Sequence, residues 1–442
     1  MRIGLVIEQF DPRRGGVEQW TAQFAAALIE RGHKVYVIAR GFGPQTETMP
    51  IVRHMLDEVR CRVGFARAAE DAIRSLNLDI VHDTGCGWHC DIFQPHGGSR
   101  RVAARQNILL APRWLQPIKR AVNSLLPRYR QFDALLKRQY ANDGRTVLAL
   151  SRRVAADLSE QHDVPDERIR LVYNGVDTQR FSPRHRTKSR NAIRTRLRIS
   201  DDTLLLLIVA HNFRLKGVPM LLEAMAAWRY SRPAHLVVVG GKRPQRYRRA
   251  ARRLGVGGSA TFVGSVDDPV PYYAAADVYV HPTYYDPCSL VVLEALASGL
   301  PVVTSRENGV SELIEDGQEG FLLEDPGNSQ EFLGQMVPLL DDNRRAVMGR
   351  AARRLARRHS FDKNVAEIIA IYEEIVQKRY RSTGGVPILS PEGTHIGATK
   401  PFICRRTGET VIDKAVSGRL AVDESSTSGG QSTPPSTSGA VR

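Results

Sequence analysis

Short apolar runs alternate with helix-like stretches along most of this chain, and this alternation limits the possible folds more than any other feature. Residues 2–8 and 33–39 have the composition of buried strands, and residues 17–31 between them have the pattern of a helix. Such a strand–helix–strand order is typical of a doubly wound parallel sheet covered by helices on both faces. Further short apolar strands are predicted at residues 78–82 and 146–149.

A second set of alternating elements begins after a basic, helix-like stretch at residues 187–198. The chain has 442 residues, 42% of them hydrophobic, which is enough for two cores, because single cores rarely grow beyond about 250–300 residues. We therefore expect an α/β protein with two Rossmann-like domains and a linker near residues 178–195. The second set comprises strands 204–210, 235–240, 260–263, 278–281 and 301–305 and helices 218–229 and 290–297.

The expected domain boundaries follow from these two sets. The first domain covers residues 1–180 and the second covers residues 181–360. An amphipathic helix in residues 361–382 is expected to pack back on the first domain. Residues 383–442 change in composition and end in Ser, Thr, Gly and Pro, which predicts a largely disordered tail.

Basic residues outnumber acidic ones, with 63 Lys and Arg against 47 Asp and Glu and a formal net charge of +16. An excess of this size attracts phosphates, whether of nucleic acid, anionic lipid or a phosphorylated substrate. No run approaches the roughly 18 apolar residues of a membrane span, and we interpret residues 1–7 as a buried strand rather than a secretory leader. The five cysteines are few and odd in number, which fits a reducing cytoplasm better than a disulfide framework.

The most informative motif covers residues 284–295, where Asp286 and Glu294 flank an apolar helix. Asp286 followed by Pro287 predicts a helix start, with the Asp as N-cap and the Pro as first helical residue. Free amides at a helix start bind anions, and eight helical residues rise about 12 Å. The simpler interpretation is that Asp286 only caps the helix and Glu294 pairs with a surface Arg. Because the helix is apolar almost all round, we expect Glu294 to face a polar cleft instead.

Two loops at predicted strand ends carry further candidate residues. Arg214, Lys216 and Gly217 follow the strand at 204–210, at the sheet edge where such folds bind ligands. The charges of Arg214 and Lys216 would neutralise a phosphate leaving group. A solvated turn is the alternative. Gly15 and Gly16 follow the first strand and would let the backbone approach a ligand closely, although a Gly pair often only forms a turn.

Residues 80–98 hold several His and Cys side chains, which invites a zinc interpretation. Their spacing fits no standard zinc finger and they lie at strand ends, so we expect no metal site there. His96 is the candidate functional residue of this segment, and the alternative is a loop His without a partner.

These motifs together resemble glycosyltransferase family 4, over roughly residues 1–375. The pattern is similar to the E-x7-E motif of that family, with Asp286 in place of the first Glu. Within the family the chain looks similar to the lipopolysaccharide core glucosyltransferase I group. The resemblance implies a GT-B fold, in which two Rossmann-like domains face a cleft, and transfer of a sugar from a nucleotide donor.

The resemblance also implies roles for individual residues. Glu294 would bind the ribose hydroxyls and Asp286 would lie near the donor sugar, one methylene shorter than the Glu of the family. The catalytic candidates are Asp286, Lys216, Arg214 and His96. The donor-binding candidates are Gly15, Gly16, Lys216, Val263, Gly264, Ser289, Leu290 and Glu294.

Residues 100–138 form a basic, amphipathic segment with ten Lys and Arg and interleaved apolar residues. Such a segment is typical of a surface that lies on an anionic membrane, and the glucosyltransferase I group has a membrane-contacting region at this place. A solvated helix pair is the alternative. Nucleic-acid binding is disfavoured because no aromatic platform accompanies the charge. We expect acceptor or membrane contacts at Glu18, Asp83, Arg113, Trp114, Lys119 and Arg120.

The resemblance thus implies a retaining glycosyltransferase that moves a hexose, expected to be glucose, from a UDP-sugar to an acceptor. The acceptor would be lipopolysaccharide core or another glycolipid or polysaccharide, at the cytoplasmic face of the inner membrane. We expect no metal, no other cofactor and no nucleic acid as partner. One rival is a Rossmann dehydrogenase, which needs Gly-x-Gly-x-x-Gly after a strand and a downstream acid, whereas the first loop of this chain offers only Gly15 and Gly16. Another is a basic membrane- or nucleic-acid-binding protein on an inactive transferase fold.

Overall fold

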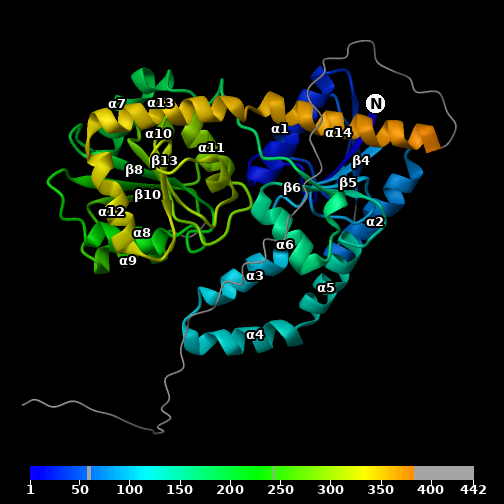
Figure 1. The fold of residues 1–442 in the computed structure, drawn as a ribbon, viewed down its shortest axis with the longest axis horizontal. Coiled ribbons are helices and arrows are strands. Elements are labelled where there is room, and N and C mark those ends of the chain that lie inside the picture. Colours follow the sequence, from blue (N-terminus) through cyan, green and yellow to red (C-terminus); the bar gives the residue numbers. More distant parts are fainter. Residues whose placement is uncertain (57–60, 242–243, 383–442) are drawn as a thin grey trace, which may run out of the picture. The chain divides into compact units, whose positions relative to one another are not determined.

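The structure, a computed structural model, describes residues 1–56, 61–241 and 244–382, without the side chains of residues 123–125 and 127–130. Two parallel sheets organise these residues (Figure 1). The first has seven strands in the order β3-β2-β1-β4-β5-β6-β7, and the second has six in the order β10-β9-β8-β11-β12-β13. This confirms the predicted fold class of two Rossmann-like halves. The predicted tail, with Cys404, lies outside the described residues.

The first sheet consists of short strands whose side chains are mostly buried, as expected of a parallel sheet covered on both faces. Its strands are β1 (Arg2–Val6), β2 (Lys34–Ala39), β3 (Val52–Met55), β4 (Ile80–Asp83), β5 (Ile92–Phe93), β6 (Thr146–Ala149) and β7 (Ile169–Leu171). The helices of this half are α1 (Gly16–Glu30), α2 (Arg62–Ser75), α3 (Arg100–Leu109), α4 (Gln116–Leu125), α5 (Pro127–Gln139) and α6 (Arg152–His162).

The second sheet repeats the pattern, and its core lies on both faces of the strands. Its strands are β8 (Leu204–Val209), β9 (Ala234–Val239), β10 (Ala260–Gly264), β11 (Val278–His281), β12 (Val302–Ser305) and β13 (Gly320–Leu323). Its helices are α7 (His185–Leu197), α8 (Val218–Ala226), α9 (Gln245–Arg253), α10 (Val270–Ala275), α11 (Leu290–Ala297), α12 (Ser329–Met336) and α13 (Asp342–Arg358). Short 3-10 turns include η2 (Arg113–Leu115) and η4 (Gly309–Leu313).

The last described helix, α14 (Phe361–Ser382), belongs to the core of the first half although it follows the second half in sequence. It lies along α1 (Figure 1) and buries Val365, Ile368 and Ile371 against the first sheet. The hydroxyl of Tyr372 lies 2.5 Å from Nδ1 of the buried His82 on β4. The first core is therefore completed by residues from the far end of the chain.

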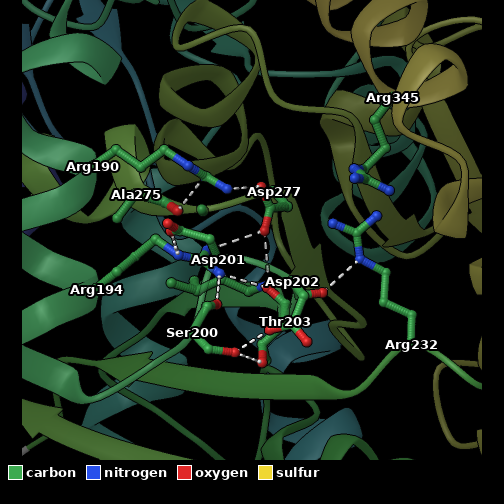
Figure 2. A network of polar contacts seen from close by, with 12 residues as sticks. Arg190, Arg194, Ser200, Asp201, Asp202, Thr203, Arg232, Ala275, Asp277 and Arg345 are labelled. Carbon is green, nitrogen blue, oxygen red and sulfur yellow. Dashed lines mark hydrogen bonds and ion pairs between the residues drawn. The ribbon is translucent and has the colours of Figure 1, made fainter.

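A buried carboxylate ties α7 to the second sheet. Asp277, just before β11, is in contact with three arginines spaced four residues apart on α7, which face it from one side of that helix. Its Oδ1 lies 3.0 Å from Arg186 and 2.9 Å from Arg190, and its Oδ2 accepts hydrogen bonds from Arg194 and from the backbone of Leu205. Figure 2 shows Arg190 and Arg194 directed at this carboxylate. The network fixes the helix that enters the second half.

Both sheets reverse strand order at one point, between β1 and β4 in the first and between β8 and β11 in the second. In open parallel sheets, ligands bind at the carboxyl ends of the strands beside such a switch point. The loops after β8 and β11 are therefore the expected location of a ligand-binding site in the second half. They contain residues 210–217 and 282–289.

Candidate active site

The loops after β8 and β11 bring together Lys216 and Asp286, two of the candidate catalytic residues. Lys216 Nζ donates a hydrogen bond of 2.5 Å to Asp286 Oδ2 and a second, of 3.2 Å, to the carbonyl of Tyr285. The next residue explains this placement. Gly217 has a φ of +76°, and a Cβ there would overlap the carbonyl oxygen of Pro282, so only glycine lets the two loops pack this closely.

Asp286 is held in its charged form by two neighbours. Its Oδ2 also lies 3.3 Å from Nε2 of His281, the last residue of β11. Burial raises the pKa of Asp286, but the charge of Lys216 and the hydrogen bond from His281 outweigh it and hold the pKa well below its usual range. His281 itself is fully buried, and this burial lowers its pKa. Lys216, Asp286 and His281 form what we call the β11 triad.

The predicted helix start at Asp286 is wrong. Helix α11 begins at Leu290 with Ser289 as its N-cap residue, and Pro287 lies outside the helix. The reason is a tertiary contact: the backbone of Asp286 pairs with the loop before η4, through its amide to Glu307 and its carbonyl to Gly309. Asp286 therefore lies four residues before the first residue of α11, too far away to be its N-cap.

The start of α11 carries a buried polar atom without a partner. Ser289 is buried, and its Oγ makes no hydrogen bond among the described residues. Its amide lies 3.3 Å from Asn308 Oδ1. Buried hydroxyls without a partner are rare, so an unpaired Oγ beside the open amides of a helix start indicates a place for an anionic ligand.

Glu294, on the second turn of α11, is half-buried and accepts a hydrogen bond of 2.7 Å from the hydroxyl of Tyr273 on α10. Burial raises the pKa of Glu294 to about 7, although the bond from Tyr273 opposes the shift. The carboxyl group therefore changes charge near neutral pH. Among the described residues its carboxylate is hydrogen-bonded to Tyr273 and not ion-paired with an Arg, although the nearby charge of Arg180 also lowers its pKa.

The Gly-Gly loop approaches the same helix start from the first half. A Cβ added to Gly16 would come within 3.3 Å of the side chain of Leu290, and Leu290 packs on the core of the first half. Gly15 caps α1 in an extended conformation, and a Cβ there would crowd the carboxylate of Glu18. The structure thus brings Gly15, Gly16, Ser289 and Leu290 to one place.

Arg214 does not join the β11 triad. Its guanidinium donates to the backbone carbonyl of Leu110, next to α3. Val263 and Gly264 lie at the carboxyl end of β10, an outer strand of the second sheet, and both are partly exposed. Gly264 has a φ of +90° and accepts a hydrogen bond from the amide of Gly240.

Asp83 organises its own loop rather than presenting a free carboxylate. Its two oxygens accept hydrogen bonds of 2.6–2.7 Å from the amides of Gly85, Cys86 and Gly87. Burial raises its pKa to about 6 against these bonds. The predicted acceptor contact of Asp83 therefore has no support from the direction of its side chain.

His96 is buried, and its ring centroid lies 4.4 Å from that of Trp20. Its Nε2 has no hydrogen-bond partner among the described residues, and burial and the nearby His82 lower its pKa to about 3. His96 is thus a neutral imidazole with one open nitrogen. Within the described part of the chain no group of three or more His, Cys, Asp or Glu side chains could hold a metal ion.

The basic segment exposes apolar side chains beside its charges. Trp114 in η2 is 70% exposed, and Ile118 on α4 is 53% exposed. Arg113 and Arg120 are exposed on the same stretch, and Lys119 is half-buried. Among the residues that the structure describes, no helix is long and apolar enough to cross a membrane.

The sequence does not single out two further candidates, His281 and Tyr273. His281 and Tyr273 fix the two acids, yet each is an ordinary polar residue within an apolar stretch. A signal for His281 exists, because it is a polar residue at the carboxyl end of a buried strand beside the switch point. Nothing in the sequence marks Tyr273.

Comparison with known proteins agrees with this geometry. Residues 14–180 match the family described as Glycosyltransferase Family 4, and residues 203–342 match the family described as Glycosyl transferases group 1. The chain belongs to glycosyltransferase family 4, whose fold is GT-B.

Individual relatives are moderately similar. The D-inositol 3-phosphate glycosyltransferase of Salinispora tropica is 32% identical over 247 residues, which cover 52% of this chain and 51% of the relative. The lipopolysaccharide glucosyltransferase WaaG of Escherichia coli is 30% identical over 216 residues, covering 48% of this chain and 58% of WaaG. The matched stretches thus span about half the length of these two curated relatives.

Solved structures extend the likeness to most of the described chain. A crystal structure of WaaG superposes with a TM-score of 0.71 at 22% identity, covering 84% of this chain and 99% of WaaG. Anabaena HepE in complex with UDP and glucose superposes with a TM-score of 0.64 at 20% identity, covering 84% of this chain and 98% of HepE. At sequence identities this low, the superpositions support a shared fold and no more.

Proposed function

We propose that this protein is a retaining glycosyltransferase that moves a hexose from a UDP-sugar to a glycolipid or polysaccharide acceptor without a bound metal. The observation that carries the proposal is the β11 triad at the switch point of the second sheet. It lies next to the start of α11, where the buried hydroxyl of Ser289 has no hydrogen-bond partner among the described residues. A nucleoside diphosphate needs positive charge and free amides, and this place offers both.

Each residue of the site has a part in that scheme. Lys216 and the amides at the start of α11 stabilise the negative charge that grows on the departing diphosphate. Glu294 accepts the ribose hydroxyls, and Asp286 orients a hydroxyl of the sugar. The acceptor hydroxyl attacks the face that the diphosphate leaves, so no protein nucleophile is required. We propose retention because of the family resemblance and not because of the spacing of the residues.

We propose glucose as the transferred sugar and lipopolysaccharide core as the acceptor, because the similar WaaG is named a lipopolysaccharide glucosyltransferase.

A UDP-release assay over a panel of nucleotide sugars tests the proposal, together with calorimetric titrations of UDP and of NAD. UDP binding without NAD binding supports it. NAD binding alone would indicate a dehydrogenase, and DNA binding without UDP binding would indicate an inactive transferase fold.

The raised pKa of Glu294 gives this test a pH dependence. The carboxylate accepts hydroxyl hydrogen bonds and the protonated acid accepts them poorly, so affinity for UDP should fall as pH drops through 7. Between pH 8 and pH 6 we expect about a tenfold loss that is due to Glu294. Because phosphate groups also titrate in this range, the informative quantity is the affinity ratio of wild type to Glu294→Gln at each pH. A ratio that stays constant with pH would remove Glu294 from the nucleotide site.

We also propose that the exposed face around η2 and α4 rests on an anionic membrane at the cytoplasmic face of the inner membrane, where a lipid-linked acceptor would be met. Basic groups beside exposed Trp114 and Ile118 combine charge attraction with shallow insertion of apolar side chains.

Reversing the charges of Arg113, Lys119 and Arg120 to Glu should therefore weaken binding to vesicles that contain anionic lipid by roughly 100-fold or more. The measurement is co-sedimentation with such vesicles, and neutral vesicles provide the baseline. A variant with Arg350, Arg354 and Arg357 on α13 reversed has the same net charge and serves as control. Equal partitioning of the two variants would contradict the proposed membrane face.

A further inference from the structure

Helix α9 carries a row of arginines that nothing in the proposed transfer reaction uses. Arg246, Arg249, Arg252 and Arg253 line one surface hollow of about 440 Å³, a volume within the range of small-molecule sites. Their spacing of three, three and one residues places all four side chains within about a third of the helix circumference. Over this short helix, like charges at three- and four-residue spacing repel one another.

These arginines differ from those that the fold uses for its own stability. Arg186, Arg190 and Arg194 on α7 share the buried carboxylate of Asp277, and Figure 2 shows two of them, Arg190 and Arg194. In contrast, no ion pair links any of the four α9 arginines to a carboxylate within the described ranges, and all four are exposed. The first turn of α9 contains no acidic residue either. A cluster of positive charges that surrounds a hollow and has no acidic partner attracts anions.

The surroundings of the hollow indicate which anion it fits. Guanidinium groups bind phosphate through two parallel hydrogen bonds, so several of them around one hollow suit several phosphates close together. The aromatic ring next to the cluster, Tyr247, packs against Phe213 with ring centroids 5.1 Å apart. It offers no stacking platform of the kind that single-stranded nucleic acid uses. Leu254 is the exposed apolar side chain next to the arginine cluster. The α9 hollow thus differs from the face around η2 and α4, which exposes the larger apolar surface of Trp114 and Ile118.

We propose that the α9 hollow is a second anion site, separate from the β11 triad, that binds a ligand with clustered phosphate groups through Arg246, Arg249, Arg252 and Arg253. The ligand is either a soluble polyphosphorylated compound or a lipid headgroup with more than one phosphate. Both present the same chemistry to the guanidinium groups. The site lies beyond the proposed transfer reaction and does not depend on it.

The test compares two triple variants of equal charge. The first changes Arg246, Arg249 and Arg253 to Gln, a good helix former, and the second changes Arg350, Arg354 and Arg357 on α13 to Gln. Inorganic tripolyphosphate is titrated by calorimetry into the full-length wild type and both variants, and circular dichroism and the thermal midpoint check that each variant is folded. We expect the α9 variant to bind tripolyphosphate at least about tenfold more weakly than the α13 variant.

A vesicle arm separates the two sources of phosphate. Vesicles with a headgroup of several phosphates are mixed with the same variants in a background with Arg113, Lys119 and Arg120 reversed, so that the η2–α4 face does not mask the result. Loss of vesicle binding in the α9 variant, beyond that of the α13 variant, assigns the site to a lipid headgroup. Loss confined to tripolyphosphate assigns it to a soluble ligand. Equal losses in the α9 and α13 variants, or no loss in either arm, would overturn the proposal.

Discussion

Lys216→Gln is expected to lower kcat by about 100- to 1,000-fold, the usual cost of removing one charge that stabilises a developing anion. Glutamine keeps most of the length of the side chain and its capacity to donate, but it removes the positive charge. Lys216 Nζ donates a hydrogen bond to Asp286, so a diphosphate bound there would share the same ammonium group. The measurement is UDP release under steady state with the preferred donor.

Two further variants separate catalysis from stability in this experiment. Lys188→Gln removes an exposed lysine on α7 and should leave kcat unchanged. The double variant Lys216→Gln with Asp286→Asn replaces the ion pair by two neutral groups, which removes the unpaired buried carboxylate and with it most of the destabilisation. It should be folded and remain inactive. A folded Lys216→Gln protein with wild-type turnover would exclude Lys216 from the chemistry.

Asp277→Asn should destabilise the protein by about 3–5 kcal/mol, because it leaves three arginines of α7 around a neutral, buried amide. The shape of the side chain is conserved, so the loss comes from charge and not from packing. The three arginines and the amide of Leu205 hold the pKa of Asp277 below its usual value against the effect of burial. A depressed pKa means that this stability is present at neutral pH and is lost only as pH falls below about 4.

Chemical denaturation at pH 7 measures this loss. The matched control is Glu324→Gln, whose carboxylate pairs with Arg306 on the surface of the same half, with both side chains more than half exposed. Exposed pairs contribute about 0–1 kcal/mol, so the control should unfold almost as the wild type does. Similar midpoints for the two variants would contradict a structural role for the Asp277 network.

The sequence predicts the arrangement of the sheets because the apolar runs of parallel strands are long enough to recognise. Strands β8 and β11 were placed within a residue or so, and the fold class followed from the order of the elements. Strands β5, with two residues, and β3, at the sheet edge with mostly exposed side chains, carry no such pattern. These two strands are defined by backbone hydrogen bonds to neighbouring strands, and such pairing cannot be predicted from the sequence of one segment alone.

The site was predictable only where local sequence decides geometry. The Lys216–Gly217 step marks a tight turn at a strand end, and the two acids eight positions apart mark the loop before α11 and the middle of that helix. The N-cap prediction failed because the contact of Asp286 with Glu307 and Gly309 comes from a distant loop. Tyr273 was missed for the same reason, because it matters only through its contact with Glu294 on another helix. His281 lies five residues before Asp286, and its place at the end of a buried strand is the signal that could have identified it.

The return of α14 to the first sheet has a consequence for how the protein is made. Tyr372 and its neighbours supply part of the first core, so that core stays incomplete while the ribosome builds the second half. About 200 residues separate β7 from Tyr372, which corresponds to about 10–40 s of translation at 5–20 residues per second. During that interval the nascent first half has an uncovered apolar face, and synthesis of α14, rather than emergence of its own strands, allows this core to be completed.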